Sequence, residues 1–260
     1  MNHEQETGTF WDHLEVLRWV IVRSLVVTVL FAVVAFCLKD WLFALVLAPR
    51  TSDFVTFRLM DVEPFSIHLM NIGLTEQFMT HMKVAFYVGL LCATPYVIYE
   101  LFRFISPGLY DRERRAGRWI IVSACFMFFL GTLVNYLIIF PLTVRFLGTY
   151  QVSADVENML TLQSYIDTLL SMSLIMGIIF ELPVLCAILG RMGFINSKLM
   201  ASYRRHAVVA ILIVAAIITP TTDIFTLCIV ALPIWLLYEL SILLVPKRVN
   251  DGKANQQTTK

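Results

Sequence analysis

The stretch WIIVSACFMFFLGTLVNYLIIFPLTV, residues 119–144, decides the fold, because it runs for 26 residues without a charged side chain. About 20 predominantly apolar residues in a helix are enough to cross the hydrocarbon core of a bilayer. This stretch is longer than that. The sequence therefore predicts an integral membrane protein built around this segment.

The composition of the whole chain agrees with this prediction. Of its 260 residues, 58% are hydrophobic and 15% are charged, against about 45–50% and about 25% in soluble domains. The net charge of +1 gives no general attraction for nucleic acid, so we expect no nucleic-acid partner. The five cysteines fall in apolar runs without a CxxC pair, which favours buried hydrophobic side chains over metal ligands or disulfides.

Outward from this segment, the chain is predicted to be an all-α bundle with six membrane spans, at about 19–38, 78–104, 118–146, 162–190, 204–219 and 223–245. The last two are expected to be short, since their strongly apolar runs cover only 207–218 and 224–238. The 12 residues of the first run extend about 18 Å in a core near 30 Å thick. Either the helix is lengthened by Arg204 and Arg205, whose side chains reach up to the headgroups, or the hairpin thins the bilayer locally.

The distribution of basic residues predicts the orientation. Most of the 20 fall on the side of the two termini, and the exceptions are Lys39, Arg50, Arg58, Lys83 and Arg145. By the positive-inside rule, both termini then lie in the cytoplasm. We expect residues 1–248 to form one membrane domain and 249–260 a disordered tail. The outer loop 39–77 is predicted to open with an amphipathic helix over 41–49.

The cytoplasmic loop after the second span carries the strongest local motif. It reads FRFISPGLYDRERR over residues 102–115, and its Pro-Gly pair ends the preceding helix. Glu113 stands among three arginines. One interpretation is a positive-inside signal with a single compensating acid. The other makes Glu113 a docking carboxylate for a cationic ligand, because a carboxylate accepts a bidentate guanidinium.

This loop resembles the first cytoplasmic loop of the TatC family, the largest subunit of the twin-arginine protein translocase. Further motifs agree in order over about residues 10–245, namely HLEVLR at 13–18, Ala48-Pro49, ATP at 93–95, YLIIFP at 136–141, FELP at 180–183, and Thr219-Pro220 with Asp223. The resemblance implies a curved bundle of six helices in the cell inner membrane, with both ends in the cytoplasm.

The resemblance also implies a binding site for twin-arginine signal peptides. Its core would be Glu113 and Phe104, with further contributions from Pro107, Tyr110, His13, Glu15, Leu17 and Arg18. The family's glutamate in the amino-terminal motif aligns with Val16, while Glu15 stands one place earlier. One residue turns a helical side chain by about 100°, so the motif leaves open whether Glu15 serves in its place.

Glu181 lies deep in the fourth predicted span, where an ionised carboxylate costs at least about 2.5–3.5 kcal/mol. It is either a bundle-facing glutamate, protonated or bonded to Asn135 or Tyr136, or a position where a partner helix docks. The resemblance favours docking and adds Tyr136, Pro49 and Asp223 to the docking surface. A longer outer turn and Leu227, where relatives carry glutamine, depart from the family pattern. Glu100 and Glu239, near helix ends, are interpreted as interfacial residues.

The resemblance implies a receptor and organising subunit for the transport of folded proteins. The sequence contains no known catalytic motif, so we do not expect an enzyme. The resemblance implies TatA/TatB-type single-span partners, a homo-oligomer within the receptor complex, and the proton-motive force as the energy source. No cofactor or metal is expected. The rival interpretation is a proton-coupled transporter of small solutes with Glu181 as the proton carrier; such a transporter would be expected to show internal repeats and more deep ionisable groups.

Overall fold

The computed structural model describes residues 3–61, 64–105, 117–150, 159–219 and 223–246. Residue contacts divide the chain into two compact units, Met1–Ile178 and Ile179–Lys260, which are described separately below. The prediction of one membrane domain over 1–248 stays a prediction, and the predicted tail at 249–260 lies outside the described residues. The five cysteines, all among the described residues, form no disulfide.

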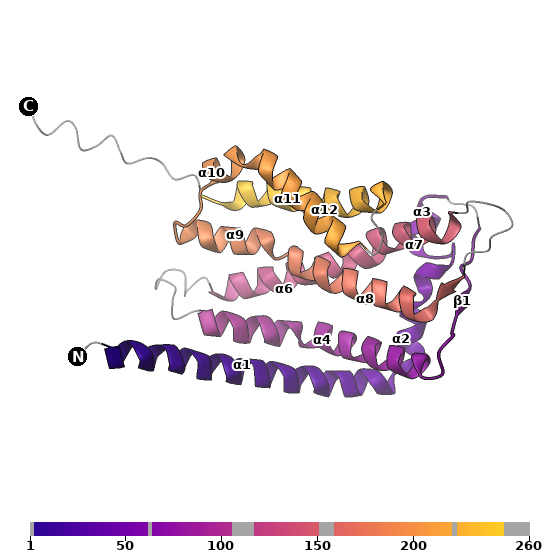
Figure 1. The fold of residues 1–260 in the computed structure, drawn as a ribbon, viewed down its shortest axis with the longest axis horizontal. Helices are drawn as coiled ribbons and strands as arrows, with labels where there is room; N and C mark the ends of the chain where they lie inside the picture. Colours follow the sequence, from indigo (N-terminus) through magenta and orange to yellow (C-terminus); the bar gives the residue numbers. More distant parts are fainter. Residues whose placement is uncertain (1–2, 62–63, 106–116, 151–158, 220–222, 247–260) are drawn as a thin grey trace, which may run out of the picture. The chain divides into compact units, whose positions relative to one another are not determined.

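The first unit is mainly helical and carries two short strands (Figure 1). In chain order it contains α1 (His3–Cys37), α2 (Lys39–Val46), the 3-10 turn η1 (Ala48–Arg50), α3 (Val55–Leu59), β1 (Leu69–Met70), α4 (Glu76–Ile105), α6 (Gly117–Val134), the π-helical turn η3 (Asn135–Ile139), α7 (Phe140–Thr149), β2 (Leu160–Thr161) and α8 (Leu162–Ile179). Strands β1 and β2 pair in parallel, with Leu69 opposite Leu160. The helix predicted at the start of the outer loop is confirmed as α2.

The second unit is helical throughout its described residues. It contains α9 (Leu182–Arg191), α10 (Ser197–Ser202), α11 (Arg204–Ile218) and α12 (Ile224–Leu244). Pro183 stands in the first turn of α9, where its missing N–H costs no hydrogen bond. The helical path of the fourth predicted span is interrupted just before it, at residues 180–181.

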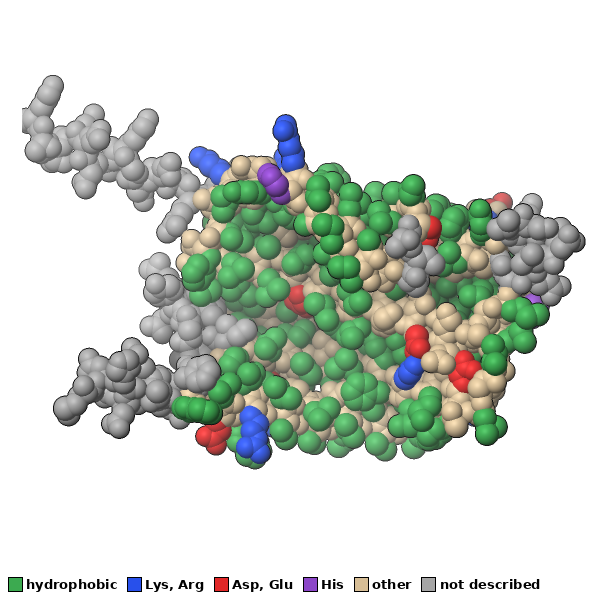
Figure 2. Space-filling model, in the orientation of Figure 1, with side chains coloured by type: hydrophobic (Ala, Val, Ile, Leu, Met, Phe, Trp, Pro, Cys, Tyr) green, Lys and Arg blue, Asp and Glu red, His purple; other side chains and the backbone are tan. Residues whose placement is uncertain are grey.

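Within the described residues, five helical segments are long and apolar enough to cross a membrane, at Leu14–Cys37, Glu76–Phe104, Gly117–Thr149, Leu162–Arg191 and Ile224–Leu244. They confirm an all-α, membrane-spanning protein. The fifth predicted span, 204–219, corresponds to α11, whose 15 residues extend only about 22 Å. Hydrophobic side chains cover most of the face drawn in Figure 2, as expected of a surface that meets lipid.

One expectation about the last hairpin is wrong. Its second helix was expected to be short, but α12 has 21 residues, or about 31 Å, in agreement with the span predicted at 223–245. Glu239 does not end the helix, since Arg204 of α11 pairs with it at 2.7 Å between Nη2 and Oε2. Only α11 of the pair is short.

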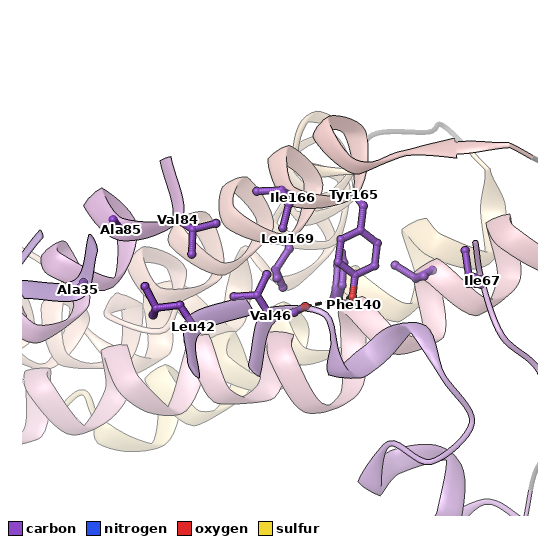
Figure 3. Close-up of a cluster of buried hydrophobic side chains, with 11 residues drawn as sticks. Ala35, Leu42, Val46, Ile67, Val84, Ala85, Phe140, Tyr165, Ile166 and Leu169 are labelled. Carbon is purple, nitrogen blue, oxygen red and sulfur yellow. Dashed lines mark hydrogen bonds between the residues drawn. The ribbon is translucent and has the colours of Figure 1, made fainter. Parts of the chain in front are cut away.

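The core of the first unit lies where α1, α2, α4, α7 and α8 meet (Figure 3). Its buried side chains include Ala35, Leu42, Val46, Val84, Phe140, Tyr165, Ile166 and Leu169. The Tyr165 ring packs edge-on against Phe140 with centroids 5.0 Å apart. The Tyr165 hydroxyl donates a hydrogen bond to the Val46 carbonyl oxygen at 3.2 Å, so α2 is held to α8 by both packing and a polar contact.

Helices α1 and α4 pack closely and set the geometry of the candidate site. A Cβ atom added to Gly89 of α4 would lie 2.5 Å from the Ala32 nitrogen of α1, which no real Cβ tolerates. The absence of a side chain at Gly89 therefore lets the two backbones come together, as small residues do in other membrane bundles. Because the helices run in opposite directions (Figure 1), the first turns of α1 lie beside the last turns of α4.

Candidate functional site

A groove opens between the first half of α1 and the end of α4. Its volume is about 470 Å³, and its walls are formed by Val16, Trp19, Val20 and Arg23 of α1 and by Glu100, Arg103 and Phe104 of α4. In the sequence, the FISPGLY motif begins at Phe104, the last of these lining residues. The groove therefore combines apolar walls with three charged side chains at the predicted cytoplasmic end of the helices.

Glu100 is the buried acid of this groove. Only 3% of the residue is exposed, and its Oε1 accepts a hydrogen bond from the Tyr96 hydroxyl at 3.0 Å. The Arg23 Nη1 lies 3.9 Å from the same oxygen. Tyr96 and Glu100 are four residues apart, and thus neighbours on one helix face. Glu100 is thus a buried and hydrogen-bonded acid, and its interpretation as an interfacial residue stays a prediction.

Phe104 was predicted to bind the signal peptide, and the structure places it in the groove, where it is half-buried. The other residues predicted in its loop, Glu113, Pro107 and Tyr110, lie outside the described residues. Their assignment to the binding site stays a prediction.

On α1, the groove is lined by Val16 and not by Glu15. The Glu15 and Arg18 side chains are exposed and Leu17 is half-buried, and none of these three belongs to the lining. His13 belongs to α1, but its side chain is outside the described part of the structure. The one-residue shift between Glu15 and the family's glutamate thus turns the carboxylate away from this groove.

Two of the predicted docking residues have structural partners within the first unit. The Tyr136 hydroxyl donates a hydrogen bond to the Leu45 carbonyl oxygen of α2 at 2.7 Å. Pro49 is buried in η1. Both residues therefore hold the outer segment of this unit in place, and their predicted contacts with a partner helix are untested.

The two predicted docking residues of the second unit are both acids. Asp223 caps α12: its Oδ1 accepts a hydrogen bond from the Thr226 backbone N–H at 2.7 Å, and the Thr226 hydroxyl donates to Oδ2 at 2.7 Å. Glu181 stands before α9, and its Oε1 is buried without a hydrogen-bond partner among the described residues. A buried, unpaired polar oxygen is costly, so Glu181 is the residue here that gains most from a binding partner.

The structure also shows ion pairs that the sequence analysis missed. Lys83 of α4 pairs with Asp167 of α8, with its Nζ 2.7 Å from Oδ1 and 2.9 Å from Oδ2. The partners are 84 residues apart in sequence, so local spacing gives no sign of the contact. Among the described residues, no group of three His, Cys, Asp or Glu side chains is placed to hold a metal ion.

Comparisons with known proteins identify the family. Residues 12–233 match the family described as "Sec-independent protein translocase protein (TatC)". A protein of that name from Deinococcus radiodurans is 35% identical over 242 residues, which are 93% of this chain and 87% of the relative. Another, from a Blattabacterium species, is 31% identical over 93% of this chain and 96% of the relative.

Solved structures give the same answer. A crystal structure of "Twin Arginine Translocase Receptor- TatC" matches with a TM-score of 0.74 and 30% identity, over 89% of this chain and 97% of that one. A second, in DDM, matches with a TM-score of 0.76 and 29% identity, over 90% and 99%. The family is a component of a protein translocase and not an enzyme. These matches do not support the rival interpretation, that the chain is a solute transporter. The chain belongs to the TatC family of Sec-independent protein translocase proteins.

Proposed function

We propose that the chain is the receptor subunit of a twin-arginine translocase and binds twin-arginine signal peptides of folded precursor proteins. The observation that carries this proposal is the groove between α1 and α4, which presents Phe104 beside the loop that holds Glu113. The solved structures that this chain resembles are described as translocase receptors. Their match over 89% and 90% of this chain supports the same role here.

The charges of the groove indicate how the peptide is held. Its described lining contains two guanidiniums and one carboxylate, and that carboxylate, Glu100, is already engaged by Tyr96 and Arg23. A pair of incoming arginines therefore needs an additional acceptor. We assign that role to Glu113; Glu15, which lies outside the groove lining, would contact only a part of the peptide that extends beyond the groove. The apolar walls at Val16 and Phe104 suit the hydrophobic part of a signal peptide.

Small single-span subunits of the TatA/TatB type complete the translocase in this proposal. In the second unit we assign their docking contacts to Glu181 and Asp223, and in the first unit to Tyr136 and Pro49. The unpaired Oε1 of Glu181 supports this choice, since a polar group from a partner helix would satisfy it. The complex would be a homo-oligomer in this subunit, would lie in the inner membrane with both termini cytoplasmic, and would use the proton-motive force.

A crosslinking experiment tests the peptide site. A photoreactive twin-arginine signal peptide should crosslink to the wild-type chain but at least about tenfold less to Glu113→Gln, since the loss of one charge-assisted pair costs about 1.5–3 kcal/mol. Asp53→Asn, an exposed acid of the outer loop, is the matched control. Equal crosslinking of Glu113→Gln and the control, or equal capture of a twin-lysine peptide, would remove this assignment.

A further inference from the structure

We propose that the groove between α1 and α4 also binds the headgroup of an anionic phospholipid, with Arg23 and Arg103 contacting its phosphate. The proposal rests on the described lining alone and does not require that the groove bind a signal peptide. It assigns a ligand to the two arginines, neither of which has a role in the proposed peptide site.

We infer that the side chains of both arginines reach the lipid headgroups. Arg103 directly precedes Phe104, the last residue of its membrane span. Arg23 is nine residues into the span that begins at Leu14, and its long side chain can extend towards the headgroup region. Trp19, which is 54% exposed, stands one turn of α1 before Arg23; tryptophan favours the membrane interface.

The accessible charge of the groove is positive. The Glu100 carboxylate is buried, and its Oε1 faces the Tyr96 hydroxyl. In contrast, the Arg23 side chain is 52% exposed and Arg103 is exposed. Arg103 has no ion pair among the described residues, and the Arg23 contact to Glu100 is long at 3.9 Å. An anion entering the groove therefore meets two accessible guanidiniums before it meets the carboxylate.

The shape of the groove favours a lipid over free phosphate. Besides the arginines, its walls are the apolar side chains of Val16, Val20 and Phe104 and the ring of Trp19. Val16 is 49% exposed, so the apolar wall continues onto the outer surface of α1, where acyl chains would lie. A volume of about 470 Å³ is within the range of about 300–1,000 Å³ typical of small-ligand sites. Basic pockets between membrane helices commonly hold anionic headgroups.

Lipid retention by the purified full-length chain tests the proposal. The delipidated protein in neutral detergent is mixed with phosphatidylglycerol or phosphatidylcholine, and bound lipid is counted by native mass spectrometry. We expect wild type to retain phosphatidylglycerol in preference to phosphatidylcholine. Each arginine contributes about fivefold, so Arg103→Gln should weaken retention about fivefold and Arg23→Gln with Arg103→Gln about 25-fold.

The matched control is the double variant Arg191→Gln with Arg205→Gln, which removes the same charge from exposed arginines of the second unit and should behave as wild type. Arg103→Gln breaks no ion pair of the described residues, so its result does not depend on a folding defect. Equal retention by the groove variants and the control would overturn the proposal. Displacement of the lipid by millimolar inorganic phosphate would overturn it as well, because the site would then be one for free phosphate.

Discussion

The Thr56 hydroxyl of α3 donates a hydrogen bond to the Leu137 carbonyl oxygen in η3. Leu137 stands four residues before Pro141, and in an α-helix the N–H of residue 141 would bond that carbonyl. Proline has no N–H to give, so Thr56 supplies the donor from the outer segment. Satisfying a freed carbonyl is what allows an irregular turn inside a membrane helix.

Replacement of Thr56 by valine should therefore destabilise the first unit. Valine keeps the shape of threonine but leaves the Leu137 carbonyl without its donor, at a cost of about 1–3 kcal/mol. Thermal unfolding in detergent measures the change, and Thr56→Ser, which keeps the hydroxyl, should unfold close to wild type. Valine and serine variants of equal stability would contradict the assigned bond.

A second polar contact in this unit joins two membrane helices. Asn135, which is 0% exposed, donates from Nδ2 to the Ser173 Oγ of α8 at 2.7 Å. A double-mutant cycle with Asn135→Leu and Ser173→Ala should give a coupling energy of about 0.6–1.7 kcal/mol, the range for interhelical hydrogen bonds in membranes. Additive effects of the two substitutions on unfolding would show that the bond contributes nothing.

The spans of this fold were predictable from the sequence because their signal is local. The length and apolarity of a run such as residues 119–144 can be seen directly in the sequence. They predict the helical segment that the structure shows at Gly117–Thr149. The pairing of Glu239 with Arg204 was not predictable, since the two residues are 35 positions apart in the sequence. A charged residue in a hydrophobic run need not end the helix when a residue from a distant segment pairs with it.

The candidate site was predictable only in part, for the same reason. The motif around Phe104 pointed to the end of α4, and the structure places Phe104 in a groove there. The burial of Glu100 depends on how α1 packs against α4, which no motif encodes. The four-residue spacing of Tyr96 and Glu100 did indicate that Glu100 has a hydrogen-bond partner, because this spacing places a hydroxyl donor beside the acid on one helix face.

The close approach of α1 and α4 gives a third prediction. Gly89→Ala adds a Cβ that meets the Ala32 backbone at 2.5 Å, and overpacking of this kind costs about 1–3 kcal/mol. The helices should separate, so a disulfide between cysteines introduced at Val20 and Phe104, on opposite walls of the groove, should form more slowly than in the parent. The matched control is Gly73→Ala, whose Cβ meets only the Glu76 side chain; the same slowing in this control would exclude the packing explanation.

Glu181 gives a fourth prediction, on the assembly proposed above. If a polar group of a partner helix bonds its unpaired oxygen, Glu181→Gln should keep copurification with single-span subunits, because the amide still hydrogen-bonds. Glu181→Leu should reduce copurification several-fold. Asp167→Asn, which removes an acid already paired with Lys83, is the comparison. Full copurification of the leucine variant would rule out docking at this residue.

The length of α11 gives the last prediction, on the bilayer itself. Its 15 residues extend about 22 Å, against about 30 Å of hydrocarbon, and a short helix makes the surrounding lipid thin or its flanking residues snorkel. Spin labels at the exposed residues Val209, Ile213 and Ile217 report depth through their accessibility to oxygen and to a water-soluble nickel complex. We expect a smaller maximum depth along α11 than at Val26 of α1, which is 59% exposed and belongs to a span of 24 residues. If labels on both helices reach the same depth, the membrane keeps its full thickness beside α11, and snorkelling by Arg204 and Arg205 must account for the short span instead.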